Sequence, residues 1–188
     1  IVFSANGDIF VPTLAATDVN ITSSNGALNF LAGSLGVAGQ NSVINAQGRN
    51  INFDSAGPTN LIGNRVTLNL TGHGDLTLNT NQLLRSQANQ TDANITVDGQ
   101  FHFLSGALLS DNGLGNYTVQ ANVVNLEPGS SISVADPNGR VSLNTTSVLT
   151  TASLEASNLS LHAGGDLFYN PGTLGRAGAA TTIDAIAD

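Results

Sequence analysis

The sequence predicts an all-β fold, a single-stranded parallel β-helix (β-solenoid) of about eight coils with roughly 22–23 residues each. Three observations lead to this fold class. A glycine-led unit recurs along the chain, short runs of alternating apolar and polar residues lie between its copies, and helix formers are scarce. Residues 1–188 are therefore expected to form one solenoid domain.

The recurring unit is a glycine, any residue, an apolar residue, any residue and a second apolar residue. Each copy is expected to be a tight turn that leads into a short strand with alternate side chains buried. The anchoring glycines are Gly7, Gly26, Gly74, Gly99, Gly139 and Gly165, and Gly48 leads a further copy with one extra residue. Residues 122–126 have the strand pattern without the glycine, which predicts one coil that lacks its anchor.

Further alternating runs predict a second or third strand in each coil. These runs are residues 19–22, 43–46, 66–70, 95–97, 132–134 and 159–161. Residues 150–159 come closest to a helical period but are better explained as two strands. Polar residues 80–94 and 108–116 are expected to be insertions between coils, on one lateral face.

Stacked coils pair their backbone groups at about 4.8 Å and bury columns of Val, Leu, Ile and Phe. The chain has 23 Asn residues, which at equivalent turn positions are expected to form ladders of side-chain amides. A β-sandwich is the main alternative, because it also has short strands and frequent turns. The shared local pattern of the anchors, and the lack of Trp and Cys, favour the solenoid.

The amino-acid composition argues against several classes of partner and site. The chain has five Arg, no Lys and a formal net charge of −8, which argues against a nucleic-acid partner. Its apolar runs are too short to predict a membrane span. The absence of Cys excludes disulfides and thiolate metal sites. The absence of Met and of an apolar leader predicts a mature or excised segment.

Several segments resemble the repeats of filamentous-haemagglutinin-type adhesins. Residues 156–167 read Ala-Ser-Asn-Leu-Ser-Leu-His-Ala-Gly-Gly-Asp-Leu, and residues 71–78, 4–9 and 46–53 are similar, degenerate copies. The resemblance implies a right-handed parallel β-helix, secreted by a bacterium through an outer-membrane pore, with an adhesive or scaffolding role. Only residues 136–139, Asp-Pro-Asn-Gly, approach a motif of the family's secretion domain, so a shaft segment is expected.

No residue is nominated as catalytic, cofactor-binding or metal-binding. The acidic residues are scattered singly, and Asp75 and Asp98 on adjacent coils are expected to be turn formers. His73, His102 and His162 lie at different offsets from their anchors, so they are not expected to align into a metal site. Residues 111–119 weakly resemble a calcium β-roll repeat but are expected to be a glycine-rich loop.

Seven Asn-x-Ser/Thr sequons occur, and Asn89, Asn94 and Asn116 are kept as candidate glycan acceptors.

The first functional hypothesis is a rod- or filament-forming segment of an extracellular adhesin, with a cell-surface glycan or protein as receptor. The alternatives are a carbohydrate-active lyase or hydrolase and a non-catalytic carbohydrate-binding β-helix. Residues 1–3 and 182–186 are strand-like without polar caps, so end-to-end stacking of copies or continuation into more chain is expected.

Overall fold

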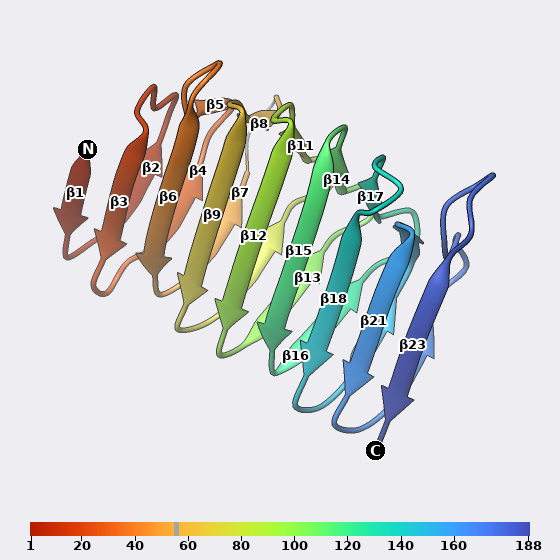
Figure 1. Ribbon diagram of the computed structural model, residues 1–188. Coiled ribbons are helices and arrows are strands. Elements are labelled where there is room, and N and C mark those ends of the chain that lie inside the picture. The colour runs from red at the N-terminus through yellow and green to blue at the C-terminus, as the bar shows by residue number, and fades with distance from the viewer. Residues whose placement is uncertain (55–56) are drawn as a thin grey trace.

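The computed structural model describes residues 1–54 and 57–188, and in these ranges the chain forms β-strands and no helix. Successive strands pass in turn through three sheets that run along the length of the molecule (Figure 1). Neighbours within each sheet are parallel and come from successive coils. This arrangement confirms the parallel β-solenoid and shows that the β-sandwich alternative is wrong.

Each of the three sheets contains one strand from most coils. The first sheet contains β1 (Val2–Ala5), β3 (Asp18–Ser23), β6 (Asn41–Gly48), β9 (Arg65–Gly72), β12 (Gln90–Val97), β15 (Leu114–Ala121), β18 (Arg140–Thr145), β21 (Asn158–Ala163) and β23 (Thr182–Ala187). The second sheet contains β2 (Ile9–Val11), β4 (Leu28–Phe30), β7 (Ile51–Phe53), β10 (Leu76–Leu78), β13 (Gln100–Phe103), β16 (Val123–Leu126), β19 (Leu149–Thr151) and β22 (Leu167–Tyr169). The third sheet contains β5 (Gly33–Leu35), β8 (Thr59–Leu61), β11 (Leu83–Ser86), β14 (Leu108–Asp111), β17 (Ser131–Val134) and β20 (Ser153–Glu155).

The register between strands gives the length of each coil. Asn45 pairs with Asn20 and with Asn69, which lie 25 and 24 residues away in the sequence. The steps from β1 to β3 and from β18 to β21 are shorter, at about 18 residues. The average coil length is about 23 residues, as predicted. It is an average over long coils of 24 or 25 residues and short coils of about 18 residues.

The coil that lacks its anchoring glycine was predicted correctly. Residues 123–126 form β16, which pairs with β13 at the position expected for a coil. Residues 150–159 contain no helix, and β19, β20 and the start of β21 cover most of them, as expected.

Two other expectations are wrong. Residues 80–94 and 108–116 are not insertions, because they contain β11 and β14 of the third sheet and the first residues of β12 and β15. Inward-facing Ser86 and Asp111 are polar, and they obscured the alternation that marks these strands.

Gly139 is not equivalent to the other anchors, because it precedes β18 in the first sheet. The anchors that lie between the first and second sheets are Gly7, Gly26, Gly74, Gly99 and Gly165, whereas Gly48 is the last residue of β6 and pairs with Gly72.

The core consists of apolar columns inside the solenoid. In the second sheet, Phe30 and Phe53 occupy successive coils and their rings stack with centroids 4.8 Å apart. In the first sheet, small Ala93 lies next to large Tyr117, so that the column keeps an even volume. Among the described residues there is no helix long and apolar enough to cross a membrane.

Candidate functional site

The outer side of the first sheet, here called the polar face, carries three long columns of outward side chains and one short column. Because alternate residues of a strand point to opposite sides, each coil contributes one residue to each long column. Between the end strands β1 and β23, the large apolar members of these columns are Val43 and Leu114. The long columns are 18, 43, 67, 92, 116, 140 and 158; 20, 45, 69, 94, 118, 142 and 160; and 22, 47, 71, 96, 120, 144 and 162, and the short column is 41, 65, 90 and 114.

An asparagine ladder occupies the middle column. The Nδ2 atom of Asn45 donates to Oδ1 of Asn20 at 2.9 Å, and Asn69 donates to Asn45 at 2.8 Å. Asn94 continues the ladder by donating to Asn69 at 3.0 Å. The predicted amide ladder therefore exists, but this one runs through the middle of the strands and not only through turns.

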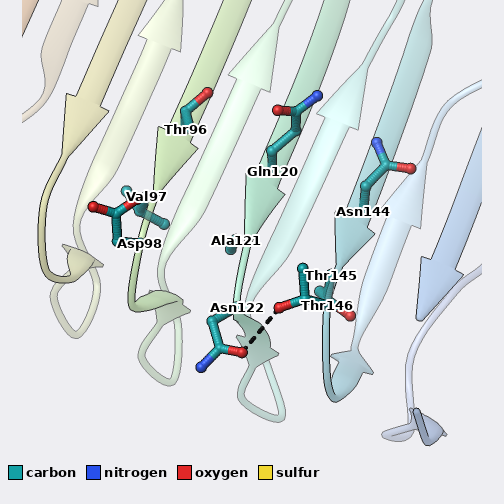
Figure 2. Close-up of a pocket in the computed structure, with 9 residues that line it drawn as sticks. All are labelled: Thr96, Val97, Asp98, Gln120, Ala121, Asn122, Asn144, Thr145 and Thr146. Carbon is teal, nitrogen blue, oxygen red and sulfur yellow. Dashed lines mark hydrogen bonds between the residues drawn. The ribbon is translucent and has the colours of Figure 1, made fainter. Parts of the chain in front are cut away.

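A groove of about 370 Å³ lies where the polar face turns toward the second sheet. Figure 2 shows Thr96, Gln120 and Asn144 side by side on neighbouring strands of this groove. Its other lining residues belong to strand ends and turns, and are Val97, Asp98, Ala121, Asn122, Thr145 and Thr146.

The groove lies over the coil that lacks its glycine. Thr96, Gln120 and Asn144 pair in one row, and Phe101, Val124 and Leu149 pair in the next. The middle coil joins these rows with one residue fewer than its neighbours. The turn of the middle coil is therefore one residue shorter than the turns on either side of it.

Polar groups without an internal partner face this groove. The side chains of Thr96 and Gln120 make no hydrogen bond within the described part of the chain. Thr146 donates from Oγ1 to Oδ1 of Asn122 at 3.0 Å, which leaves the Asn122 amide nitrogen available. The one charged lining residue is Asp98, whose carboxylate lies 3.3 Å from Nδ1 of His73. The groove therefore offers hydroxyl and amide groups to a neutral polar ligand.

The three histidines lie at unrelated places, as their offsets predicted. His73 lies in a turn beside Asp98, His102 lies on β13 beside Glu127, and His162 lies on β21 beside Asp188. Within residues 1–54 and 57–188 no group of three metal-binding side chains comes together.

Two aspartates that follow anchoring glycines, Asp8 and Asp75, make hydrogen bonds at the turns, which for Asp75 is the predicted role of a turn former. Oδ1 of Asp8 accepts from the amide of Ala27 at 2.8 Å, and Oδ1 of Asp75 accepts from the amide of Gln100 at 2.7 Å. Each bond links a turn to the same turn of the next coil. The glycine is needed because the coils approach so closely: a Cβ on Gly99 would overlap the Asp75 carboxylate.

A buried polar cluster interrupts the core where the third sheet turns into the first. Asp111 ends β14 and accepts from the Tyr117 hydroxyl at 2.7 Å and from the Gly113 amide at 2.8 Å. Beside it, the hydroxyls of Ser86 and Thr91 are hydrogen-bonded at 2.5 Å. Burial raises the pKa of Asp111 despite these donors. Residues 111–119 are thus mostly strand, and the expected glycine-rich loop is limited to the turn before β15.

The candidate glycan acceptors differ in their surroundings. Asn89 is exposed next to a turn, with its Nδ2 3.4 Å from Oδ1 of Asn64. Asn94 is the last rung of the asparagine ladder, and Asn116 donates to Asp92 at 3.0 Å. Their modification stays a prediction.

Comparisons of the chain with protein families, with curated proteins and with solved structures found no match. The structure thus defines the protein as a β-solenoid with an outward polar face. Sequence reasoning missed the groove, because its lining residues come from three coils whose register the sequence did not determine.

Proposed function

We propose that this chain is a structural and adhesive rod, a segment of a secreted bacterial surface protein of the filamentous-haemagglutinin type. The observation that carries the proposal is the polar face, in which every coil adds its outward side chains to the same columns. Such a surface repeats weak polar contacts at each coil, so its affinity for a surface grows with the number of coils engaged.

The family assignment rests on the short repeat motifs. In residues 156–167, Leu159 and Leu161 point inward from β21, and Gly164, Gly165 and Asp166 make the turn into β22. The motif therefore coincides with one strand and one turn of a coil, which is the unit that the resemblance requires. The secreted location and the bacterial source follow from that resemblance alone.

Carbohydrate recognition is a second candidate, and the groove of Figure 2 favours it. Sugar hydroxyls pair well with the Gln120 amide and with the amide nitrogen of Asn122, and a single carboxylate disfavours anionic sugars. A lyase or hydrolase would need several convergent carboxylates, whereas Asp98 is the only one that lines this groove. A non-catalytic site is therefore the version that we propose.

Binding of the whole chain to a glycan array and to immobilised cell-surface glycoproteins tests both candidates. Gln120→Ala is expected to weaken binding of neutral glycans several-fold. Gln87→Ala is the matched control, because Gln87 is also an exposed glutamine and lies away from the groove. Binding that survives Gln120→Ala unchanged rejects the groove, and no binding to any surface rejects the adhesive role. Release of reducing ends from a neutral glycan would instead support catalysis.

A further inference from the structure

One long column of the polar face leaves most of its hydrogen-bonding groups unused. It crosses six neighbouring strands from β3 to β18, and its members here, called the hydroxyl–amide column, are Thr22, Gln47, Thr71, Thr96, Gln120 and Asn144. Within residues 1–54 and 57–188, four of these side chains make no hydrogen bond, namely Thr22, Thr71, Thr96 and Gln120. The column therefore has donors and acceptors to offer to a ligand.

The neighbouring asparagine ladder shows how a column on the same strands can instead satisfy itself. Asn45, Asn69 and Asn94 each donate to the asparagine of the preceding coil, at 2.9, 2.8 and 3.0 Å. In the described part of the chain, no such bond joins successive members of the hydroxyl–amide column, although the register between their strands is the same. The ladder holds coils together, whereas the hydroxyl–amide column stays available.

Two hollows of the polar face follow one another along this column. The groove of Figure 2 is lined by the last three members of the column, and a second hollow of about 240 Å³ is lined by the first three. Each hollow also includes two buried apolar side chains, Val97 and Ala121 in the groove and Ile21 and Ala46 in the second hollow. A single extended ligand along the column can therefore contact both hollows.

The charge and the spacing of the column indicate the class of ligand. All six members are neutral, so the column has no charge to pair with an ionic ligand. Neighbouring strands lie about 4.8 Å apart, so the column spans about 24 Å along the solenoid. A pyranose unit of an extended, linear polysaccharide advances its chain by nearly one strand spacing. An extended peptide advances by only about 3.3 Å per residue and does not match this repeat.

We propose that the hydroxyl–amide column binds a linear, neutral polysaccharide that lies along the solenoid axis and presents about one sugar to each coil. Sugar hydroxyls pair with the hydroxyl and amide groups of the column, and the C–H groups of the sugar rings contact the apolar side chains of the hollows. The proposal rests on the glycan recognition suggested for the groove, because the groove holds one part of the same glycan. Each coil adds one weak contact, so affinity increases with glycan length.

Titration calorimetry of the whole chain with β-linked gluco-, manno-, xylo- and galacto-oligosaccharides, from disaccharides to octasaccharides, tests the length dependence. For the sugar that binds, the dissociation constant is expected to fall with each added unit and to level off at about six units, since the column has six members. It is expected to change little between low and high salt, because the column is neutral. Affinity that does not increase beyond the disaccharide would overturn the proposal.

Thr71→Val separates an extended site from binding at the groove alone. Thr71 lines the second hollow and not the groove. The variant is expected to bind a hexasaccharide roughly threefold to tenfold more weakly, because one hydroxyl contact is lost, and to bind a disaccharide almost unchanged. Thr67→Val is the matched control, since Thr67 lies on the same strand and the same face in another column and lines neither hollow. Equal effects of the two variants on the hexasaccharide would contradict the proposal.

These measurements also distinguish failure of the extended site from failure of the proposed function. Binding that Gln120→Ala weakens but that neither glycan length nor Thr71→Val changes rejects the extended site and keeps the groove. Binding of glycoproteins without binding of any free oligosaccharide rejects both the column and the groove, and keeps the adhesive role. Thermal unfolding confirms that each variant is folded.

Discussion

Tyr117 donates a hydrogen bond of 2.7 Å from its hydroxyl to Oδ2 of Asp111, and both side chains are buried inside the solenoid. Burial raises the pKa of Asp111, and burial together with the nearby carboxylate raises the pKa of Tyr117 well above its ordinary value. The pair is six residues apart in the sequence and links the end of β14 to β15. Its effect on stability is therefore open to direct measurement.

Asp111 is expected to make the free energy of unfolding decrease as the pH rises, which is the opposite of the usual effect of a carboxyl group in a folded protein. Its folded-state pKa lies above the unfolded value of about 3.9, so the folded chain binds this proton more tightly. The resulting stabilisation is fully present below the unfolded pKa and is lost as the pH rises through the folded pKa. Asp111→Asn removes this dependence. Urea unfolding above about pH 4 is expected to show the wild type losing stability relative to the variant, and parallel pH profiles would contradict this.

Tyr117→Phe is expected to destabilise the protein by about 1–3 kcal/mol, because Asp111 would lose a donor in a buried environment. Tyr169→Phe is the matched control, since Tyr169 is the other tyrosine and is 49% exposed. Urea unfolding at neutral pH measures both variants. Equal losses from the two variants would show that the buried hydrogen bond contributes nothing specific.

Asn69→Ala is expected to destabilise the solenoid by about 1–2 kcal/mol, because Asn69 donates to Asn45 and accepts from Asn94, and both bonds would be lost. Thr118→Ala changes the same column one step beyond the ladder and is expected to alter stability by less than about 0.5 kcal/mol. Thermal unfolding compares the two variants. If both lower the melting temperature equally, the ladder is not a stabilising element.

Gly99→Ala and Gly7→Ala place the same methyl group at equivalent sequence motifs. At Gly99 the methyl would overlap the Asp75 carboxylate and lie 2.9 Å from the Gly74 carbonyl oxygen, with an expected loss of about 1–3 kcal/mol. At Gly7 no atom lies within 4 Å, so little change is expected. Chemical denaturation measures both variants, and a harmless Gly99→Ala would show that the coils can separate at this turn.

Much of the fold was predictable because a solenoid repeats a local pattern. Alternating residues predicted the strand at 122–126 even without its glycine, and the Asn excess predicted amide ladders. The third sheet was less visible, because β11 and β14 place Ser86 and Asp111 inward, where an apolar residue is expected. These polar residues are stable inside because they bond to residues of other strands.

The residues of the candidate groove could not be predicted together, because they come from different coils and are neighbours only through the register between those coils. Local sequence determines that Gln120 points outward, since alternation along a strand needs only its neighbours. Whether Gln120 lies beside Thr96 and Asn144 depends on the number of residues in each coil and turn.

The sequence by itself determined the parallel solenoid, its inward columns and its mean coil length, because these follow from short-range alternation and glycine turns. The tertiary structure decided which residues meet across coils, including Asp111 with Tyr117 and the shared column of Thr22 and Asn144. The physical reason is register. A turn that is one residue shorter leaves every strand intact but changes which side chains of neighbouring coils lie side by side.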